Sequence, residues 1–447
     1  MIINFTVKNY KSIKEEMIFN MQPVADKSYQ DNLIITKNKH YPKLLKSAFI
    51  CGQNASGKSN TLEALDTMRK IILSKPQSTD KIEYFPFKLD TDSKTQPTEF
   101  KIIFLINDIK YIYGFSYNSD KIISEYLYYY PNGKVTTIFK KKENEPFKFV
   151  DKIKQQEEIS SNLSPNSLYL PVAAWINIDP IKEIYEYFSK NLIYISSNDL
   201  DNAILSVLNR ITIADSRNDI FKQKLEIAIT HADLGAKGIA IGQNKYPNSI
   251  KGIVEDFLLS AVKNDVIKIK NDDSNNTTQN IEDEIKQRVN NLQNPVLSIK
   301  HTYLDDAKKS TEILFDLTSE ESNGTKRLIF LMSFIIDALQ DGKTILIDEI
   351  ELNLHPNIIK YITSLFNNIN NKASQLIFTT HNYDLLDLPK SRFRKDQIWF
   401  TEKDNNSQET KLYSLSDFKE RKGLDIKKRY FIGKYGSVPN IYGDVFG

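Results

Sequence analysis

An α/β fold is predicted by three features of this sequence. A glycine-rich loop at residues 52–59 stands between a short apolar run and a helix-like stretch. A second apolar run, Thr344–Glu349, ends in two acids, and a third, Gln375–His381, ends in a histidine. Short apolar runs are typical of buried strands, and their combination with helical patterns is typical of α/β proteins.

The loop fits a phosphate-binding pattern of glycine, four residues and then Gly-Lys-Ser. Its residues are Gly52, Gln53, Asn54, Ala55, Ser56, Gly57, Lys58 and Ser59, and Asn60 follows them. The glycines let successive N–H groups point at phosphate oxygens, and the helix N-terminus adds partial positive charge. Lys58 can reach the β- and γ-phosphates, and the Ser59 hydroxyl can ligate Mg²⁺. These residues predict an ATP·Mg²⁺ site rather than a loop that binds no nucleotide.

The flanking residues supply the strand and the helix that this motif requires. Ser47–Cys51 is an apolar run before the loop, and apolar residues at helical spacing follow it at Leu62, Leu65, Met68 and Ile72. Cys51 at the end of the strand is best explained as a small buried residue.

The run Thr344–Glu349 resembles the carboxylate strand of nucleotide hydrolases, the Walker B strand. Asp348 would hold Mg²⁺, directly or through water, and Glu349 would orient and deprotonate the attacking water. A buried strand that ends in exposed acids by chance is the structural alternative, and the phosphate-binding loop makes it the weaker one.

His381 follows the next apolar strand, Gln375–Thr380. A histidine just beyond a strand end, beside a γ-phosphate, can sense or polarise that phosphate through a hydrogen bond. A lone histidine in such a place is more often structural. The position one strand after the two acids favours the functional interpretation.

A serine and a glycine at a helix start form the fourth element. Ser322, Asn323 and Gly324 precede an amphipathic stretch with apolar residues at Leu328, Met332, Ile335 and Leu339. Such a start can cap an anion, but an ordinary helix cap explains the same residues.

The order of these parts resembles the ABC-type ATPase heads of SMC and RecF-like proteins. The resemblance implies a mixed central sheet flanked by helices, an antiparallel β layer and an inserted helical arm or lid. It also implies a homodimer or higher oligomer, in which Ser322, Asn323 and Gly324 of one subunit cap the γ-phosphate held by the other. Transporters carry Leu-Ser-Gly-Gly-Gln instead, so the departure argues against a transporter.

Other segments narrow the resemblance. Phe5–Ile13 is similar to the first strand of RecF-like heads, and Glu349–Pro356 is similar to the Glu-x-x-x-x-Leu-His-Pro stretch of OLD-like ATPases. Trp399–Lys403, Tyr413–Phe418 and Tyr430–Gly436 resemble the tail of the RloA/AbiLi-like abortive-infection group. That group implies anti-phage defence and a separate effector, a toxin or nuclease from an adjacent gene. The tail lacks the acid cluster of an OLD-type nuclease.

The resemblance also implies four parts along the chain. Residues 1–150 form the first lobe of the head, residues 151–310 a mostly helical insertion, residues 311–390 the second lobe, and residues 391–447 a tail that packs on the head. The first lobe holds strand-like runs such as Phe100–Ile106, which are expected to form the antiparallel layer. Heads of this type place a glutamine there that contacts Mg²⁺ and water. Gln96 is the candidate, although a glutamine in a turn needs no such role.

The insertion and the tail carry weaker signals. Helical spacing appears in residues 181–188, 250–261 and 281–292, and residues 270–279 are polar. His231 and His301 have no partners at metal-ligand spacing, so they are expected to be structural. Basic residues are frequent between 419 and 434, and they fit a solvated face better than a nucleic-acid surface.

Composition sets the remaining limits. The chain has 447 residues, a net charge of +3 and 40% hydrophobic residues, so it can bury a large core and its charge does not demand a nucleic-acid partner. One cysteine excludes an intrachain disulfide and suits the cytoplasm. No apolar run approaches the roughly 20 residues of a membrane span, and a signal peptide is not expected. A DNA-repair ATPase that binds DNA directly and a scaffold that does not hydrolyse ATP remain the alternatives.

Overall fold

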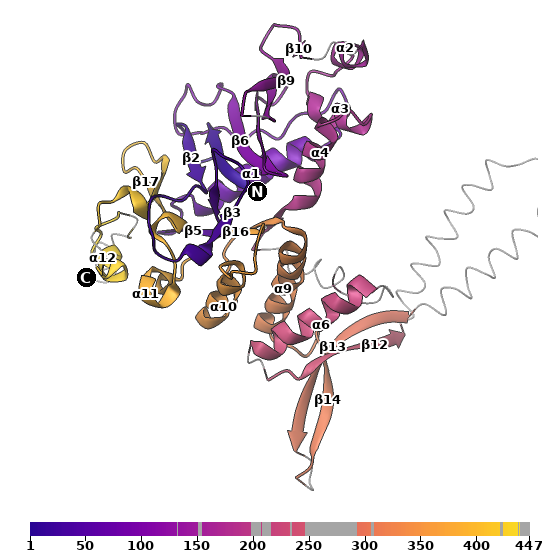
Figure 1. Cartoon of the computed structure of the whole chain (residues 1–447), viewed down its shortest axis with the longest axis vertical. Coiled ribbons are helices and arrows are strands. Elements are labelled where there is room, and N and C mark those ends of the chain that lie inside the picture. The colour runs from indigo at the N-terminus through magenta and orange to yellow at the C-terminus, as the bar shows by residue number, and fades with distance from the viewer. Residues whose placement is uncertain are drawn as a thin grey trace, which may run out of the picture. The chain divides into compact units, whose positions relative to one another are not determined.

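The computed structural model describes residues 1–131, 133–150, 154–197, 207, 216–232, 235–245, 293–304, 308–420, 423–436 and 438. The chain divides into two compact units (Figure 1), of which the first comprises residues 1–199 and 334–447 and the second residues 200–333. The predicted insertion, 151–310, therefore overlaps the second unit, while residues 154–197 fold within the first. The helical spacings predicted at 250–261 and 281–292 lie outside the described residues, as does the polar segment 270–279.

One sheet of the first unit is antiparallel throughout and has seven strands. Its order is β10 (Lys148–Phe149), β9 (Thr136–Lys141), β8 (Ile122–Tyr130), β7 (Ile109–Tyr117), β6 (Thr98–Ile106), β1 (Ile2–Lys8) and β2 (Met17–Asn20). Apolar and aromatic residues alternate along these strands, so one face is buried. This is the predicted antiparallel layer.

The second sheet of this unit is mixed and has six strands. Its order is β11 (Leu192–Ile195), β15 (Thr344–Ile347), β16 (Gln375–Thr379), β5 (Ser47–Gly52), β17 (Ile398–Lys403) and β18 (Thr410–Ser414). The first five strands are parallel, and only β18 is antiparallel. The α/β fold with a mixed central sheet is thus confirmed. The sequence set residues 391–447 apart as a tail. Their strand β17 nevertheless lies inside this sheet, between β5 and β18, and its residues Ile398 and Phe400 are buried.

Helices and a short hairpin complete the first unit (Figure 1). The helices are α1 (Lys58–Leu73), α2 (Lys154–Ser161), α3 (Tyr169–Trp175), α4 (Ile181–Glu186), α10 (Pro356–Phe366), α11 (Leu388–Ser391) and α12 (Ile426–Phe431), with a π-helical turn at Tyr187–Asn191. The hairpin joins β3 (Leu33–Ile35) to β4 (Lys43–Leu45). Short 3-10 turns lie at Gln30–Asn32, Tyr383–Leu386, Lys395–Gln397 and Leu415–Asp417.

The core of the first unit is rich in aromatic rings. Phe104 of β6 stacks on Tyr111 of β7 and on Tyr187, with ring centroids 5.7 and 4.7 Å apart. Leu62 and Met68 of α1 are buried in the same cluster. Large rings bury much apolar surface at low conformational cost, so this cluster fixes α1 and the loop before it.

The second unit contains strands that the sequence did not predict. Its described elements are α6 (Ser216–His231) and an antiparallel sheet of β12 (Gly238–Lys245), β13 (Gln293–Leu304) and β14 (Ser310–Asp316). His301 lies 2.6 Å from Glu321 and packs on Phe315, and His231 ends α6. Helix α9 (Asn323–Asp341) begins in this unit and ends in the first.

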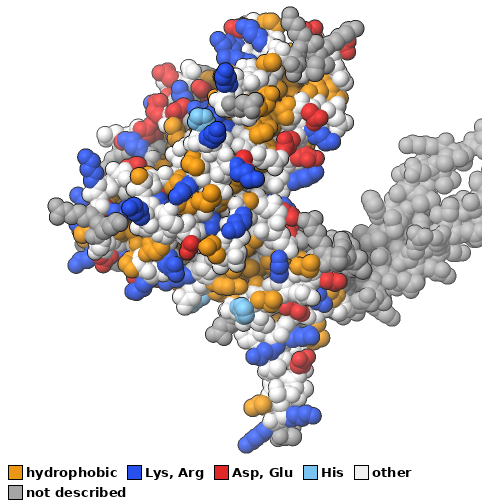
Figure 2. Space-filling model, viewed as in Figure 1, with side chains coloured by type: hydrophobic (Ala, Val, Ile, Leu, Met, Phe, Trp, Pro, Cys, Tyr) orange, Lys and Arg blue, Asp and Glu red, His pale blue; other side chains and the backbone are white. Residues whose placement is uncertain are grey.

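Among the described residues, none of the helices combines the length and the apolar character that crossing a membrane requires. On the face shown in Figure 2, Lys and Arg side chains are spread among Asp and Glu rather than gathered in one field. This agrees with the small net charge of +3.

Candidate functional site

The candidate site lies at one edge of the six-stranded sheet. Strands β5, β15 and β16 are parallel neighbours, so their carboxyl ends share that edge. The glycine-rich loop follows β5, Asp348 follows β15, and His381 comes two residues after β16. Ligands of open α/β sheets bind at the carboxyl ends of the strands. The fold therefore brings together three motifs that are remote in the sequence.

The loop turns through two residues with positive φ angles, Ala55 at 60° and Gly57 at 99°. A side chain at Gly57 would overlap Thr410, and one at Gly52 would overlap Thr401, so both positions require glycine. No side chain caps the start of α1. The first N–H groups of this helix are therefore available to an anion.

The hairpin of β17 and β18 supports the loop. The Thr410 hydroxyl donates to the Ser56 carbonyl at 2.9 Å, and the hydroxyls of Ser56 and Thr401 lie 2.7 Å apart. Asn60 donates from its amide to the Ser12 hydroxyl at 2.6 Å instead of facing the loop. Thr401 and Thr410 were missed by sequence reasoning because no local pattern links them to residues 52–59.

Lys58 is buried and bonded to its own loop. Its ammonium donates to the carbonyls of Gly52 and Gln53, both at 3.0 Å. Burial lowers the pKa of Lys58, and Cys51 and then Glu351 oppose this shift. A phosphate would offer stronger acceptors than these neutral carbonyls.

Ser59 and Thr379 lie near the Asp348 carboxylate. The Thr379 hydroxyl donates to Asp348 Oδ1 at 2.6 Å. Burial raises the pKa of Asp348, whereas the Thr379 and Ser59 hydroxyls lower it. Thr379 also accepts from the Glu349 backbone N–H at 2.8 Å, so it orients both acids. Its role is not visible in the sequence, where it is one residue of an apolar strand.

This pair of oxygen donors fits Mg²⁺. Magnesium is typically held by one or two protein ligands, with phosphate oxygens and water filling the other positions. Within the described residues, no group of three or more His, Cys, Asp or Glu side chains converges on a metal position. Ser59 and Asp348 would thus need a bound triphosphate to complete the coordination.

Glu349 and His381 border the same site. Glu349 has a φ of 50°, a left-handed conformation that costs free energy in a non-glycine residue and often marks functional positions. Burial, and then the Lys58 ammonium, lower the pKa of His381. The His381 backbone N–H donates to one oxygen of Glu351. The other oxygen of Glu351 is buried and accepts no hydrogen bond from the described residues.

The helix α12 reaches the loop through tyrosine rings. The Tyr383 hydroxyl donates to the Gly52 carbonyl at 3.3 Å, and its ring stacks on Tyr430 of α12 with centroids 4.7 Å apart. Two of the basic residues of this region are paired, Lys427 with Asp384 and Arg429 with Glu420.

Ser322, Asn323 and Gly324 belong to the second unit, at the start of α9. The Ser322 hydroxyl accepts from the Thr325 backbone N–H at 3.1 Å, as in an ordinary helix cap. Ser322 and Asn323 are exposed. The Ser322 and Thr325 hydroxyls also lie 3.0 Å apart, and when Thr325 donates in that pair the Ser322 hydroxyl can donate its own proton to another acceptor.

Gln96 is exposed in the turn before β6. Its backbone carbonyl accepts from the Asn9 amide at 2.6 Å. Among the described residues, its side chain forms no hydrogen bond with the loop at 52–59.

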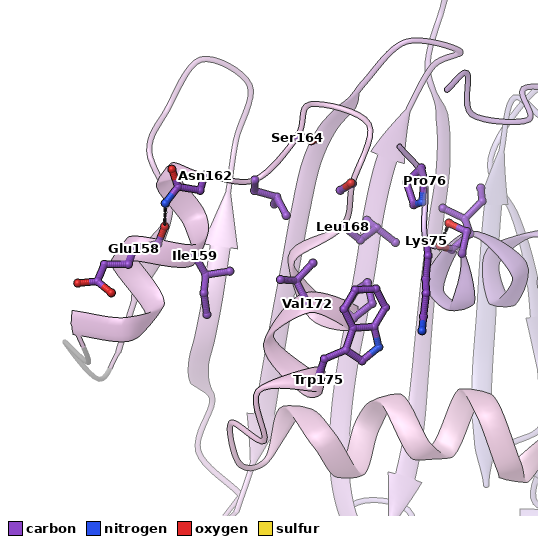
Figure 3. Close-up of a pocket in the computed structure, with 14 residues that line it drawn as sticks. Lys75, Pro76, Glu158, Ile159, Asn162, Ser164, Leu168, Val172 and Trp175 are labelled. Carbon is purple, nitrogen blue, oxygen red and sulfur yellow. Dashed lines mark hydrogen bonds between the residues drawn. The ribbon is translucent and has the colours of Figure 1, made fainter. Parts of the chain in front are cut away.

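A surface cavity of about 480 Å³ lies apart from these residues (Figure 3). Leu168, Val172 and Trp175 line it from α3 and its cap, and Ile159 lines it from α2. The Lys75 ammonium lies 4.8 Å from the centroid of the Trp175 ring. None of the loop residues or acids of the candidate site reaches this cavity.

Comparison with known proteins identifies the family. Residues 47–387 match the model of a family described as "AAA domain, putative AbiEii toxin, Type IV TA system". No curated protein is a significant match.

Solved structures of SMC heads resemble the chain weakly. A head bound to the C-winged helix domain of ScpA shares 13% identity at a TM-score of 0.41, covering 92% of this chain and 97% of that one. The SMC head of Thermotoga maritima shares 11% at 0.39, covering 92% and 98%. A Pyrococcus furiosus SMC head with an extended coiled coil, bound to the C-terminal domain of ScpA, shares 14% at 0.35, covering 93% and 97%. Similarity at this level carries no functional inference.

Proposed function

This chain belongs to that AAA-domain family, and we propose that it is an ABC-type ATPase that hydrolyses ATP to ADP and phosphate in a prokaryotic anti-phage defence system. The position of Ser59 beside the Asp348 carboxylate, near the buried Lys58, carries the proposal. The sheet brings the loop and the acid to one edge, where a nucleotide and its metal ion would need both.

Positioning and charge neutralisation account for the proposed catalysis, as in other phosphoryl transfers. The N–H groups of residues 52–60 and the Lys58 ammonium would bind the phosphate oxygens. Ser59 and Asp348 would hold Mg²⁺, which neutralises charge on the β- and γ-phosphates when bound. Lys58 would exchange its two loop carbonyls for phosphate oxygens.

Glu349 is proposed to orient the attacking water and to accept its proton. The Glu349 backbone N–H donates to the Thr379 hydroxyl, and this hydrogen bond holds Glu349 at the edge of the sheet. His381 has a lowered pKa, so its imidazole is neutral at neutral pH and can donate one hydrogen bond to the γ-phosphate. Glu351 holds the His381 backbone in place.

A homodimer or higher oligomer is proposed to complete the site. Ser322, Asn323 and Gly324 of one subunit would cap the γ-phosphate bound to the other, and ATP would favour the closed assembly through contacts that ADP cannot make. The exposed hydroxyl of Ser322 supports this role, because it can donate to a phosphate while it accepts from Thr325.

The biological role that we propose is control of a separate effector, a toxin or nuclease encoded by an adjacent gene, in the cytoplasm. The resemblance of the tail to abortive-infection ATPases supports it. The family description favours a second candidate, in which this chain is itself the toxic component. Expression of the chain alone distinguishes the two, since arrest of growth without the adjacent gene supports the second.

The test of the enzymatic proposal is the Glu349→Gln variant. ATP turnover should fall by about 10²–10³-fold, while ATP still binds and traps a dimer that light scattering detects. Glu15→Gln, the same change at an exposed position, is the matched control and should retain full activity. Equal turnover in the two variants would reject the catalytic role of Glu349, and no turnover by the wild-type chain would show that it is a scaffold.

The partner is tested by affinity purification of the chain with the product of the adjacent gene, with and without ATP. We expect a complex whose amount depends on the nucleotide. Its absence in both conditions would reject the effector model and leave the ATPase proposal intact.

A further inference from the structure

A second polar cavity of about 470 Å³ lies in the first unit, where three turns of the antiparallel layer and its hairpin converge. The loop between β3 and β4 supplies Lys37, Lys39 and His40, and β7 supplies Lys110. Tyr130, at the end of β8, forms a wall. The cavity shares no residue with the nucleotide site, and pockets of this size, roughly 300–1,000 Å³, hold small ligands in proteins.

The loop that carries these cations is held by its own hydrogen bonds. The Asn38 side-chain oxygen accepts from the backbone N–H groups of His40 and Tyr41, at 3.0 and 3.1 Å. Its amide donates to the Asp108 carbonyl at 2.9 Å, which ties the loop to the β6–β7 turn. The cations are therefore presented by a fixed loop rather than by a free one.

The opposite wall approaches the loop closely. Gly133, in the turn between β8 and β9, has a φ of 77°, and a Cβ there would lie 3.4 Å from His40 Nε2. A glycine at this point lets the turn and the loop face each other across a narrow space.

Positive charge dominates the cavity. In the described ranges, Lys37, Lys39 and Lys110 form no ion pair with an acid. Asp108 is the one carboxylate among the lining residues, and it already accepts from the Lys37 backbone N–H at 3.0 Å. Three ammonium groups thus face a single acid.

Lys110 carries the strongest indication of an anionic ligand. Its ammonium lies 3.5 Å from the centroid of the Tyr130 ring and 5.5 Å from that of Tyr41. Burial lowers its pKa, and no acid compensates. A partly desolvated cation without a counter-ion is costly, and a bound anion would remove part of that cost.

We propose that this cavity binds a phosphate group of a single-stranded nucleic acid, held by Lys37, Lys39 and Lys110. Tyr130 and Pro131 offer surfaces against which a base can pack. Cations beside aromatic rings are the combination that binds single strands without sequence preference. This inference goes beyond the proposed ATPase function and adds a nucleic-acid input to it.

The test is the binding of a fluorescent oligothymidylate of about 12 nucleotides, a length within the usual site sizes. Fluorescence anisotropy, without ATP and Mg²⁺, compares the wild-type chain with the triple variant Lys37→Gln, Lys39→Gln, Lys110→Gln. The variant should bind at least about tenfold more weakly, and the slope of log K against log salt should fall by about 0.7, the contribution of one contacted phosphate on a single strand.

The matched control removes the same charge elsewhere. Lys70, Lys81 and Lys190 are exposed lysines, each paired with an acid. Their triple glutamine variant should bind within about twofold of wild type, because released counterions come from the contacted phosphates only. Equal loss in both triple variants would show nonspecific attraction and overturn the proposal. So would tight binding of phosphatidylserine vesicles through the same lysines with no binding of the oligonucleotide.

Folding and activity are followed in parallel. Both triple variants should keep wild-type ATP turnover, so that a failure of the ATPase proposal is measured separately. If the pocket variant does not fold, Lys39→Glu, a single change at an exposed position, takes its place and should weaken binding severalfold. Unchanged affinity of that variant would also reject the site.

Discussion

Two helices of this chain begin at Ser/Gly-containing loops, and they differ in what occupies their first N–H groups. Helix α1 starts after Gly57, which adopts a φ of 99° and provides no side-chain cap. Helix α9 starts after Ser322, whose hydroxyl accepts from the Thr325 N–H at 3.1 Å. The start of α1 is open to an anion, whereas the start of α9 is already capped.

This difference assigns unequal tasks to the two motifs. Open N–H groups and a buried lysine can bind phosphate charge directly. The capped serine can add only a donated hydrogen bond from its hydroxyl, a smaller contribution. The loop at 52–59 would therefore supply most of the binding, and Ser322 would contribute to closure of the assembly.

A third helix start extends the comparison. The buried Glu125 carboxylate of β8 accepts from the backbone N–H groups of Tyr169 and Leu170, at 2.7 and 3.1 Å, at the start of α3. Tyr113 donates to it at 2.9 Å. Here the chain itself provides the hydrogen-bond acceptor, a place that α1 leaves open to a ligand.

The largest effect is expected from Lys58→Ala, which removes the cation of the open helix start. ATP turnover should fall by about 10³-fold, against about tenfold for Ser322→Ala. If the serine acts on the partner's nucleotide, an equal mixture of the two variants regains about a quarter of the wild-type rate, since half of the dimers are mixed and each has one intact site. A mixture no faster than Ser322→Ala alone contradicts action in trans.

Gly57→Ala tests the geometry of the same start. The new methyl group would overlap Thr410 in a conformation that disfavours alanine, so unfolding by urea should show a loss of roughly 2–6 kcal/mol. The double variant with Thr410→Ala removes the overlap but retains the backbone strain. If the double variant loses as much free energy of unfolding as the two single variants added together, Thr410 does not restrict the loop.

Glu125→Gln tests the helix start that the chain caps itself. Burial raises the pKa of Glu125 to about 7, although its hydrogen bonds act to lower it. Between about pH 4.5 and 7 the folded chain therefore holds a proton on Glu125 that the unfolded chain has lost. Raising the pH through this window should lower the free energy of unfolding by roughly 3 kcal/mol, and the effect should end above pH 7. The glutamine variant should lack this component, whereas Glu16→Gln, an exposed control, should retain it. Parallel pH curves for all three proteins would reject the assignment.

The smallest effect concerns stability at the capped start of α9. Ser322→Ala should reduce the free energy of unfolding by about 1 kcal/mol, and Ser322→Asp, which restores a cap, should recover it. If Ser322→Asp restores the free energy of unfolding but not ATP turnover, Ser322 contributes to catalysis in addition to capping the helix. Recovery of both by aspartate would show that the cap alone matters.

Local patterns predicted the three strands that border the candidate site. The runs at 47–51, 344–349 and 375–380 became β5, β15 and β16, because a buried parallel strand needs a continuous apolar segment. Strand β17 and the sheet of β12, β13 and β14 were among the strands that were missed. Strand β17 lies in a segment that was set apart as a tail, and β12 and β13 lie in an insertion that was expected to be mostly helical. Pairing with neighbouring strands decided their structure.

By itself the sequence determined where a phosphate-binding pattern lies, because the spacing of Gly52, Gly57, Lys58 and Ser59 is a local property of one loop. Only the tertiary structure decided that Ser59 lies near Asp348, that Thr379 orients both acids, and that Thr410 closes the space behind Gly57. These residues come from separate strands and loops, and the order of strands in the sheet brings them together. No local pattern encodes that order, since it follows from which buried faces pack together.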